Sequence, residues 1–192
     1  MHKLLLRTMT TLCLMGLLSS AAWSDNNQLL LEYDREFSLM AEQDNAVRVQ
    51  LFADGLVQVH YPFFMRLAGD YRYQLTSSEL QRTIDQLQQL GLDTFNTTVA
   101  KQSLNLEKQA AFEAARLPGN SVTIITDPEI THIRVHGLAN TLATPHQIDF
   151  IGARNDAQLY PQVTILSDLV AALDILDAFT NDTRMQFSEV TP

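Results

Sequence analysis

VRVQLFADGLVQVHY, residues 47–61, decides the fold of this chain. Apolar and polar residues alternate on both sides of Ala53-Asp54-Gly55, as in two half-buried strands joined by a tight turn. The register that keeps one face apolar is the one we expect, because shifting a strand by one residue turns every side chain to the other face. Gly55 suits the left-handed position of a three-residue hairpin loop. Such a loop gives the pairs Val47–Tyr61, Val49–Val59 and Leu51–Val57.

A capped helix follows this hairpin and a further strand over 71–75. Thr76-Ser77-Ser78-Glu79 is a capping box, in which a hydroxyl and a glutamate satisfy two backbone amides at the start of a helix. Leucine and isoleucine then recur at helical spacing, and Gly91 suits the C-terminal cap. The sequence therefore predicts a helix over 77–90.

Two more helices and a first strand are predicted outside this stretch. The strand lies within 29–39, and the last helix lies within 163–179, where apolar residues form one broad face. The pattern over 97–117 is helical but weaker. We expect this helix to pack through one stripe of side chains: Val99, Leu106, Ala110, Ala114 and Leu117.

A second hairpin is predicted around Asp127-Pro128-Glu129-Ile130, since proline suits the second position of a turn. Residues 137–160 are expected to be mostly loop with a short ordered piece over 148–151, and the tail from Thr180 is expected to fray. The expected pairs of the second hairpin are Thr126–Thr131, Ile124–Ile133 and Val122–Val135.

These elements predict an α+β fold. We expect an antiparallel sheet of about five or more strands, built from hairpins, with two to three helices packed on one face. The helices over 77–90 and 163–179 are the ones that we expect to cover it.

The first residues have the pattern of a secretory signal peptide. Lys3 and Arg7 precede the apolar run Leu12 to Leu18, and small residues surround the expected cleavage site after Ser24, with Ala22 as the alternative. The run is short for spanning a bilayer, so a retained membrane anchor is the less favoured reading.

We therefore expect a signal peptide over 1–24 and a single globular domain over 25–192. The protein would be periplasmic or secreted, with no stable membrane insertion after cleavage. Cys13 is the only cysteine and falls within the leader, so the remaining domain can form no disulfide and no thiolate metal site.

The expected domain is acidic. The chain carries 13 basic and 22 acidic residues, and without Lys3 and Arg7 the balance is 11 to 22, a net charge of −11. Nucleic acid and anionic membrane surfaces reward clusters of lysine and arginine, and the basic residues here are few and scattered. We therefore expect no nucleic-acid partner.

The segment from Leu51 to Phe95, about a quarter of the 192 residues, resembles a family of uncharacterised exported bacterial domains. In that family a strand with Asp-Gly leads to a second strand and then to a Leu-Ser/Thr-x-x-Glu-Leu helix that ends in glycine and an aromatic residue. The matching motifs are a turn, a helix cap and a helix exit. The resemblance implies an exported α+β domain and provides no catalytic residues. The matching residues are Leu51–Val59, Gly69–Tyr71, Leu75–Leu80 and Leu90–Phe95.

Four histidines are the weak candidates for a metal site. His132 and His136 have the spacing of two ligands on a helix, but on the strand predicted here residues four apart are roughly 13 Å apart. His60 on the first hairpin and the loop residue His146 could join them only if the hairpins were neighbours. No metal site is favoured, and no cofactor is expected.

Phe63-Phe64-Met65 is the candidate binding segment. Three large apolar residues in a loop can form a lip that engages a partner or an apolar ligand. The structural alternative is that this loop folds under a helix and fills the core.

No motif of nucleophilic, phosphate-binding or dinucleotide-binding sites occurs in the chain. The leading hypothesis is therefore an exported, periplasmic, non-enzymatic protein that binds an unknown protein or small molecule. A small hydrolase or metal-dependent enzyme with a histidine cluster is the second hypothesis. An accessory subunit of an envelope complex is the third, with Phe63 to Met65 as its contact.

Overall fold

The computed structural model describes residues 28–36, 44–117, 119, 121, 123, 125–138 and 144–188. The expected signal peptide, 1–24, lies outside these residues. The elements in chain order are β1 (Leu29–Glu36), β2 (Ala46–Phe52), β3 (Leu56–Tyr61), β4 (Gly69–Gln74), α1 (Ser77–Gln89), α2 (Thr97–Ala115), β5 (Ile130–Val135), β6 (His146–Ile151), α3 (Ala153–Leu159), α4 (Thr164–Ala178), the 3-10 turn η1 (Phe179–Asn181) and β7 (Gln186–Phe187).

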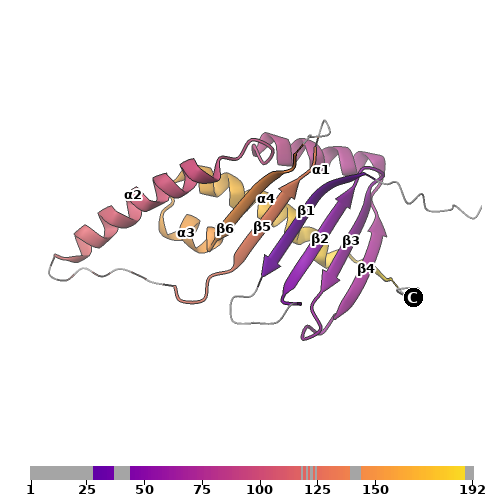
Figure 1. The fold of residues 1–192 in the computed structure, drawn as a ribbon, viewed down its shortest axis with the longest axis horizontal. Coiled ribbons are helices and arrows are strands. Elements are labelled where there is room, and N and C mark those ends of the chain that lie inside the picture. The colour runs from indigo at the N-terminus through magenta and orange to yellow at the C-terminus, as the bar shows by residue number, and fades with distance from the viewer. Residues whose placement is uncertain are drawn as a thin grey trace, which may run out of the picture.

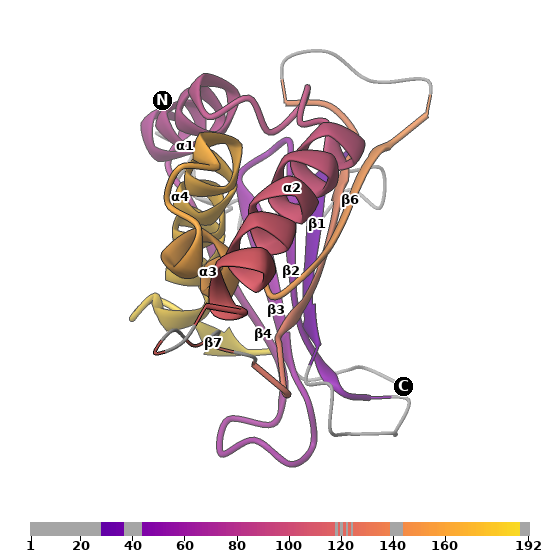
Figure 2. The same ribbon diagram turned by 90° about the vertical axis from the view of Figure 1, so that its left-hand side faces the viewer.

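The seven strands form one antiparallel sheet in the order β6-β5-β1-β2-β3-β4-β7 (Figure 1). Figure 2 shows the sheet nearly edge-on, with the helices gathered on one of its faces. No helix of the described chain covers the opposite face, which we call the open face. The predicted α+β class is confirmed.

The first hairpin has the predicted register. Val49 pairs with Val59 and Leu51 with Val57, across a loop of three residues. Gly55 has a φ of 87°, and its amide donates to the Phe52 carbonyl at 2.9 Å. The next amide, that of Leu56, donates to Asp54 Oδ1 at 2.8 Å, so the aspartate side chain also closes the turn.

Both predicted ends of α1 are confirmed. Thr76 and Glu79 form the reciprocal bonds of a capping box. At the other end Gly91 has a φ of 67°, its amide donates to the Gln88 carbonyl, and the Leu92 amide reaches back to the Leu87 carbonyl. This pair of bonds is a Schellman motif, which turns the chain back over the core.

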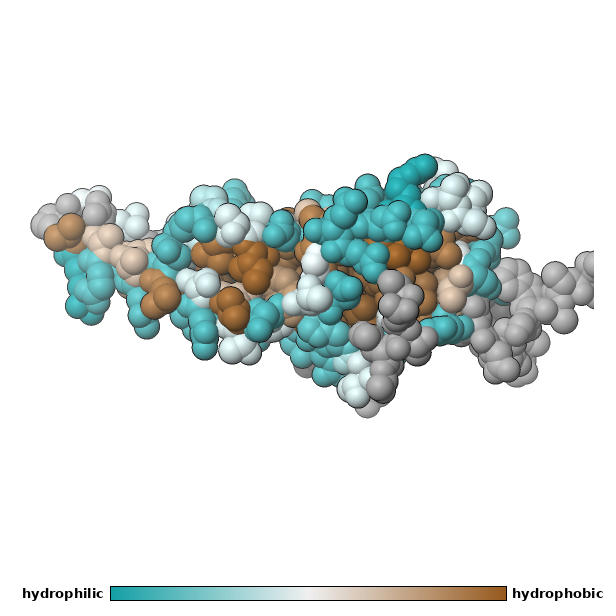
Figure 3. Space-filling view, turned by 90° about the horizontal axis from the view of Figure 1, so that it is seen from above, coloured by the Kyte–Doolittle hydropathy of each residue, from teal (hydrophilic) through white to brown (hydrophobic). Residues whose placement is uncertain are grey.

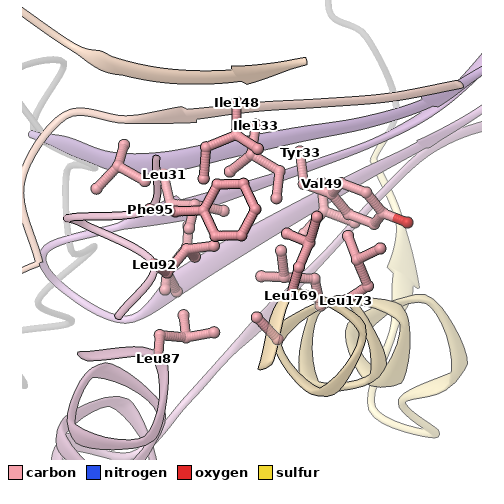
Figure 4. Close-up of a cluster of buried hydrophobic side chains, with 14 of the residues drawn as sticks. Leu31, Tyr33, Val49, Leu87, Leu92, Phe95, Ile133, Ile148, Leu169 and Leu173 are labelled. Carbon is pink, nitrogen blue, oxygen red and sulfur yellow. The ribbon is translucent and has the colours of Figure 1, made fainter. Parts of the chain in front are cut away.

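The core lies between the sheet and the helices α1 and α4. Figure 4 shows side chains of β1, β2, β5 and β6 pointing toward these helices, with Phe95 between them. Along β2 and β5 every second residue is buried, as the alternation of side chains predicts. The largest fully buried side chains include Leu31, Tyr33, Leu51, Leu87, Leu92, Ile133, Ile148, Leu166, Leu169 and Leu173.

A network of hydrogen bonds and ion pairs joins the helices to β1. The Tyr33 hydroxyl donates to Asp177 Oδ1 at 3.0 Å, and burial raises the pKa of Tyr33 far above its ordinary value, so it remains a donor. Arg35 and Arg154 reach the same carboxylate at 3.0 and 2.6 Å, and Arg154 also pairs with Asp174. The network thus joins β1, α3 and the end of α4.

The predicted second hairpin is wrong. β5 pairs with β1 on one side and β6 on the other, so Thr131 faces Arg35 and Phe150, and no edge is left for the residues before the turn. Thr126 lies in a bend, and Val122 and Ile124 fall outside the described residues. The predicted hairpin paired β5 with the residues just before it. β5 instead pairs with the next strand, β6, and with the distant β1, and a local pattern cannot show the pairing with β1.

Two regions predicted as irregular are ordered. The stretch over 137–160 contains β6 and α3, and part of the tail after Thr180 forms β7. Thr180 is itself buried, because η1 packs against β3. The Tyr61 hydroxyl of β3 donates to the Thr180 carbonyl. β7 then adds two residues to the edge of β4.

The helix α2 buries a different face from the predicted stripe. Ala100 and Leu104 are its buried residues. The C-terminal half of α2 extends beyond the sheet (Figures 1 and 2), so much of its surface meets solvent. Three members of the predicted stripe are exposed: Val99 in the first turn of α2 at 46%, Leu106 near its middle at 67%, and Leu117 just after its end at 62%.

The hairpin turn yields a testable prediction. We expect Gly55→Ala to destabilise the fold by about 1–3 kcal/mol, because a non-glycine residue is strained at positive φ. An added Cβ would also lie 2.9 Å from the Leu75 carbonyl oxygen. Urea unfolding followed by circular dichroism measures the change.

Gly91→Ala is the matched control. Gly91 has a similar φ of 67°, but its added Cβ would meet only Thr94 Oγ1, at 3.5 Å. We expect the smaller loss for Gly91→Ala. Equal losses would show that the contact with Leu75 is without effect.

Candidate functional site

Two rows of polar side chains cross the open face of the sheet. Each row is a series of cross-strand neighbours, since directly opposite residues in antiparallel strands share a face. The row that we call the charged row consists of Asp149, His132, Asp34, Arg48, His60 and Asp70, running from β6 to β4. The row that we call the glutamine row consists of Gln147, Arg134, Glu32, Gln50, Gln58, Arg72 and Gln186, running from β6 to β7.

The centre of these rows is a closely paired group of charges. Asp34 is only 5% exposed, and its carboxylate accepts a bond from Arg48 Nε at 2.6 Å and faces Arg134 at 3.7 Å. Burial acts to raise the pKa of Glu32, but bonds from Gln50 and Arg134 outweigh it and lower the pKa overall. Glu32 therefore remains ionised, and the two acidic side chains of β1 together hold Arg48 of β2 and Arg134 of β5.

His60 lies between two carboxylates at the β4 end of the charged row. Its Nδ1 is 2.7 Å from Asp70 Oδ1, and its Nε2 is 2.7 Å from Asp44 Oδ1. Burial acts to lower the pKa of His60, but the bonds and charges of Asp44 and Asp70 outweigh it and raise the pKa above 6.5. The site therefore favours the imidazolium, which has a donor on each ring nitrogen.

The predicted binding segment lies next to His60, in the loop between β3 and β4. Phe63 is 60% exposed and contacts Phe64 edge to face, whereas Met65 packs against the core. The Phe63 amide donates to Asp44 Oδ2 at 3.2 Å. Asp44 thus joins the base of the loop to His60.

A hollow of about 460 Å³ lies on the open face over β2, β3 and β4. Its wall combines amide, guanidinium, imidazole, hydroxyl and carboxylate groups, so it offers both donors and acceptors. Its polar lining residues are Asp44, Arg48, Gln50, Gln58, His60, Asp70, Arg72 and Ser188.

The structure does not bring the four candidate histidines together. His60 is on β3 and His132 on β5, and β1 and β2 lie between these strands. His132 also lies between two carboxylates, with Asp149 2.6 Å from Nδ1 and Glu36 3.6 Å from Nε2. Carboxylates on opposite nitrogens of a ring point apart and cannot bind one ion together with that ring.

The remaining two histidines lie near the other end of β5. His136 directly follows β5, and its amide donates to the Leu30 carbonyl, while His146 begins β6 opposite Val135. Among the residues that the structure describes, no three histidine, cysteine or acidic side chains are placed to hold a metal ion.

Sequence reasoning identified the polar face of the first hairpin but missed Asp44, Asp70 and Asp34 as members of a site. The register of the hairpin places Arg48 opposite His60 on that face. The carboxylates come from a bend, from the next strand and from the first strand. Local periodicity alone could not show that Asp44 and Asp70 meet His60 while Asp34 meets Arg48.

A separate groove of about 390 Å³ lies between α2, α3 and the segment before β5. Lys108 and the buried Asp156 form an ion pair of 2.8 Å beside it. Figure 3 shows hydrophobic surface along the part of the molecule where α2 lies. The apolar lining residues are Phe112, Ile125, Pro128, Ile151, Leu159 and Tyr160.

No known protein family, curated protein or solved structure matches this chain. None of the helices in the described part of the chain combines the length and the apolar character needed to cross a membrane.

The centre of the charged row yields a prediction. We expect Asp34→Asn to lower the free energy of unfolding by about 1–3 kcal/mol, because two arginines lose a buried ionic partner. Asp149→Asn, whose side chain is 61% exposed, is the control and should cost at most about 1 kcal/mol. Urea unfolding of both variants measures the difference, and an equal cost would contradict a central role for Asp34.

The pH dependence of stability tests the protonation of His60. Its pKa is raised above 6.5 in the folded state, so its stabilisation is complete below pH 6.5 and is lost as the pH rises through the folded value. We expect the stability difference between the parent and His60→Gln to shrink over that window. The change should stay below about 1 kcal/mol, since a third of the side chain is exposed. Unfolding curves at a series of pH values measure it, and a difference that grows with pH would contradict the assignment.

Proposed function

We propose that this chain is an exported, non-enzymatic protein that acts by binding a ligand or a partner protein on the open face of its sheet. The observation that carries this proposal is the hollow over β2, β3 and β4, with the exposed Phe63 on the neighbouring loop. The leader-like first residues support export.

The chemistry of the hollow supports binding rather than catalysis. Both ring nitrogens of His60 are engaged by carboxylates, so the ring has no free nitrogen to take a proton from a substrate. Arg48 is likewise held by Asp34. These groups form a fixed, mutually paired surface.

The lining favours a polar ligand with both donors and acceptors. Gln50 and Gln58 carry side-chain amides, which can donate and accept at once, and positive and negative groups stand beside them. Peptide amides or sugar hydroxyls match this mixture. Phe63 would add an apolar contact at the rim.

An accessory subunit of an envelope complex is the second candidate, and a different observation favours it. Val99 and Leu106 on α2 and Leu117 just after its end are exposed, and the apolar groove lies beside this helix. Exposed apolar surface of this kind is typical of contacts between proteins.

Export can be tested with a reporter that is active only outside the cytoplasm. We expect residues 1–28 to export it, because a positive start and an apolar run are the features that the secretory machinery reads. Leu14→Arg should abolish export, since a charge interrupts the run. Cytoplasmic retention of the unaltered fusion would refute the proposal.

Binding on the open face can be tested by thermal shift with panels of short peptides and oligosaccharides. For a compound that raises the Tm, we expect Gln58→Ala to weaken binding about tenfold, or about 1.4 kcal/mol, the loss of a hydrogen bond. Phe63→Ala should weaken it also.

Gln147→Ala is the matched control, because Gln147 belongs to the same glutamine row but lies on the edge strand β6, outside the lining of the hollow. It should leave binding unchanged. If all three variants bind as the parent does, the ligand lies elsewhere and the hollow is not the site.

A further inference from the structure

His60 can donate a hydrogen bond to both neighbouring carboxylates only when its ring is protonated. A neutral imidazole has one N–H and one bare nitrogen, whereas both nitrogens of His60 lie 2.7 Å from carboxylate oxygens. In the neutral ring, the bare nitrogen would face an acceptor oxygen at hydrogen-bond distance. Loss of the proton therefore replaces one of the two bonds with a repulsive contact.

The two carboxylates differ in how firmly they are held. Asp70 belongs to β4 and is the direct cross-strand partner of His60, so the backbone ladder keeps it in place. Asp44 lies in a bend before the first residue of β2, outside the ladder. Asp44 is therefore the partner that can move away when the ring is neutral.

Asp44 also reaches the loop that carries Phe63. Its Oδ1 faces His60 and its Oδ2 accepts the Phe63 amide at 3.2 Å. One carboxylate thus connects the titrating ring to the backbone of the exposed Phe63. A movement of Asp44 would release the amide of Phe63 together with the imidazole.

Other charged groups around His60 do not duplicate this connection. Arg48 is its cross-strand neighbour on β2 and is directed to Asp34, and Arg72 lies one row away on β4. Burial of the ring opposes protonation, and the bonds and charges of Asp44 and Asp70 outweigh it, in agreement with the raised pKa of His60.

We propose that His60 is a proton-operated latch for the loop between β3 and β4. Protonated His60 holds Asp44, and Asp44 holds Phe63 against the rim of the hollow. Deprotonated His60 releases Asp44, and the loop gains freedom. That the latch controls the access of a ligand to the hollow rests on the proposed binding function. The movement of the loop itself can be measured without a ligand.

The single tryptophan of the chain makes the test direct. Trp23 lies in the leader, so a full chain with Trp23→Phe and Phe63→Trp carries one tryptophan, on the loop. Phe63 is 60% exposed, which leaves room for the larger ring. Fluorescence anisotropy of this reporter is followed against pH, and NMR of the five histidine rings gives the pKa of His60 by comparison with His60→Gln.

We expect the anisotropy to fall as the pH rises, with a midpoint equal to the NMR pKa of His60. Adding His60→Gln or Asp44→Ala should give low anisotropy at every pH, and circular dichroism verifies that these variants fold. Adding His132→Gln is the matched control, because His132 also lies between two carboxylates but does not contact the loop. It should leave the transition intact.

Two results would overturn the latch. One is an anisotropy that stays constant while His60 titrates, and the other is a transition that persists in His60→Gln. The outcome is separate from the proposed function. A pH transition of the loop, together with unchanged ligand binding by Gln58→Ala and Phe63→Ala, would support the latch and refute the site. A pH-independent loop, together with weakened binding by these variants, would do the reverse.

Discussion

β1 lies inside the sheet, between β5 and β2, with Tyr33 fully buried on one face and Asp34 nearly buried on the other. Successive residues of a strand point to opposite faces, so Tyr33 and Asp34 make their interactions on different faces of the sheet. Tyr33 packs in the core and binds Asp177 of α4. Asp34 holds Arg48 and Arg134 from the strands on either side. The helices and the open face are both organised around this one strand.

The same alternation explains why the open face is rich in paired charges. One face of the sheet has no helical cover, so its side chains must be compatible with water and with one another. Cross-strand neighbours of opposite charge satisfy both conditions at the centre of the charged row. The row ends differently at the β4 side, where Asp44, from outside the strand ladder, completes the environment of His60. That exception connects an otherwise rigid surface to an exposed loop.

Much of the fold could be predicted from local pattern. Alternation set the register of the first hairpin, Thr76 and Glu79 marked the start of α1, and Gly91 marked its end. These signals depend on residues close in the chain. The predicted second hairpin failed because β5 pairs instead with β1 and β6. The stripe of α2 was assigned to the wrong face because a helix with apolar residues on both sides does not reveal which side has a partner.

The sequence by itself determined the class of the fold, the first hairpin, the capped helix and the polar character of the face bearing Arg48 and His60. Only the tertiary structure decided the order of the strands and which side chains contact His60. Asp44, His60 and Asp70 come from a bend and two strands, and their contacts depend on ladder register and chain path together. Alternation specifies which face a residue occupies, but distance between side chains is fixed only when separate segments pack.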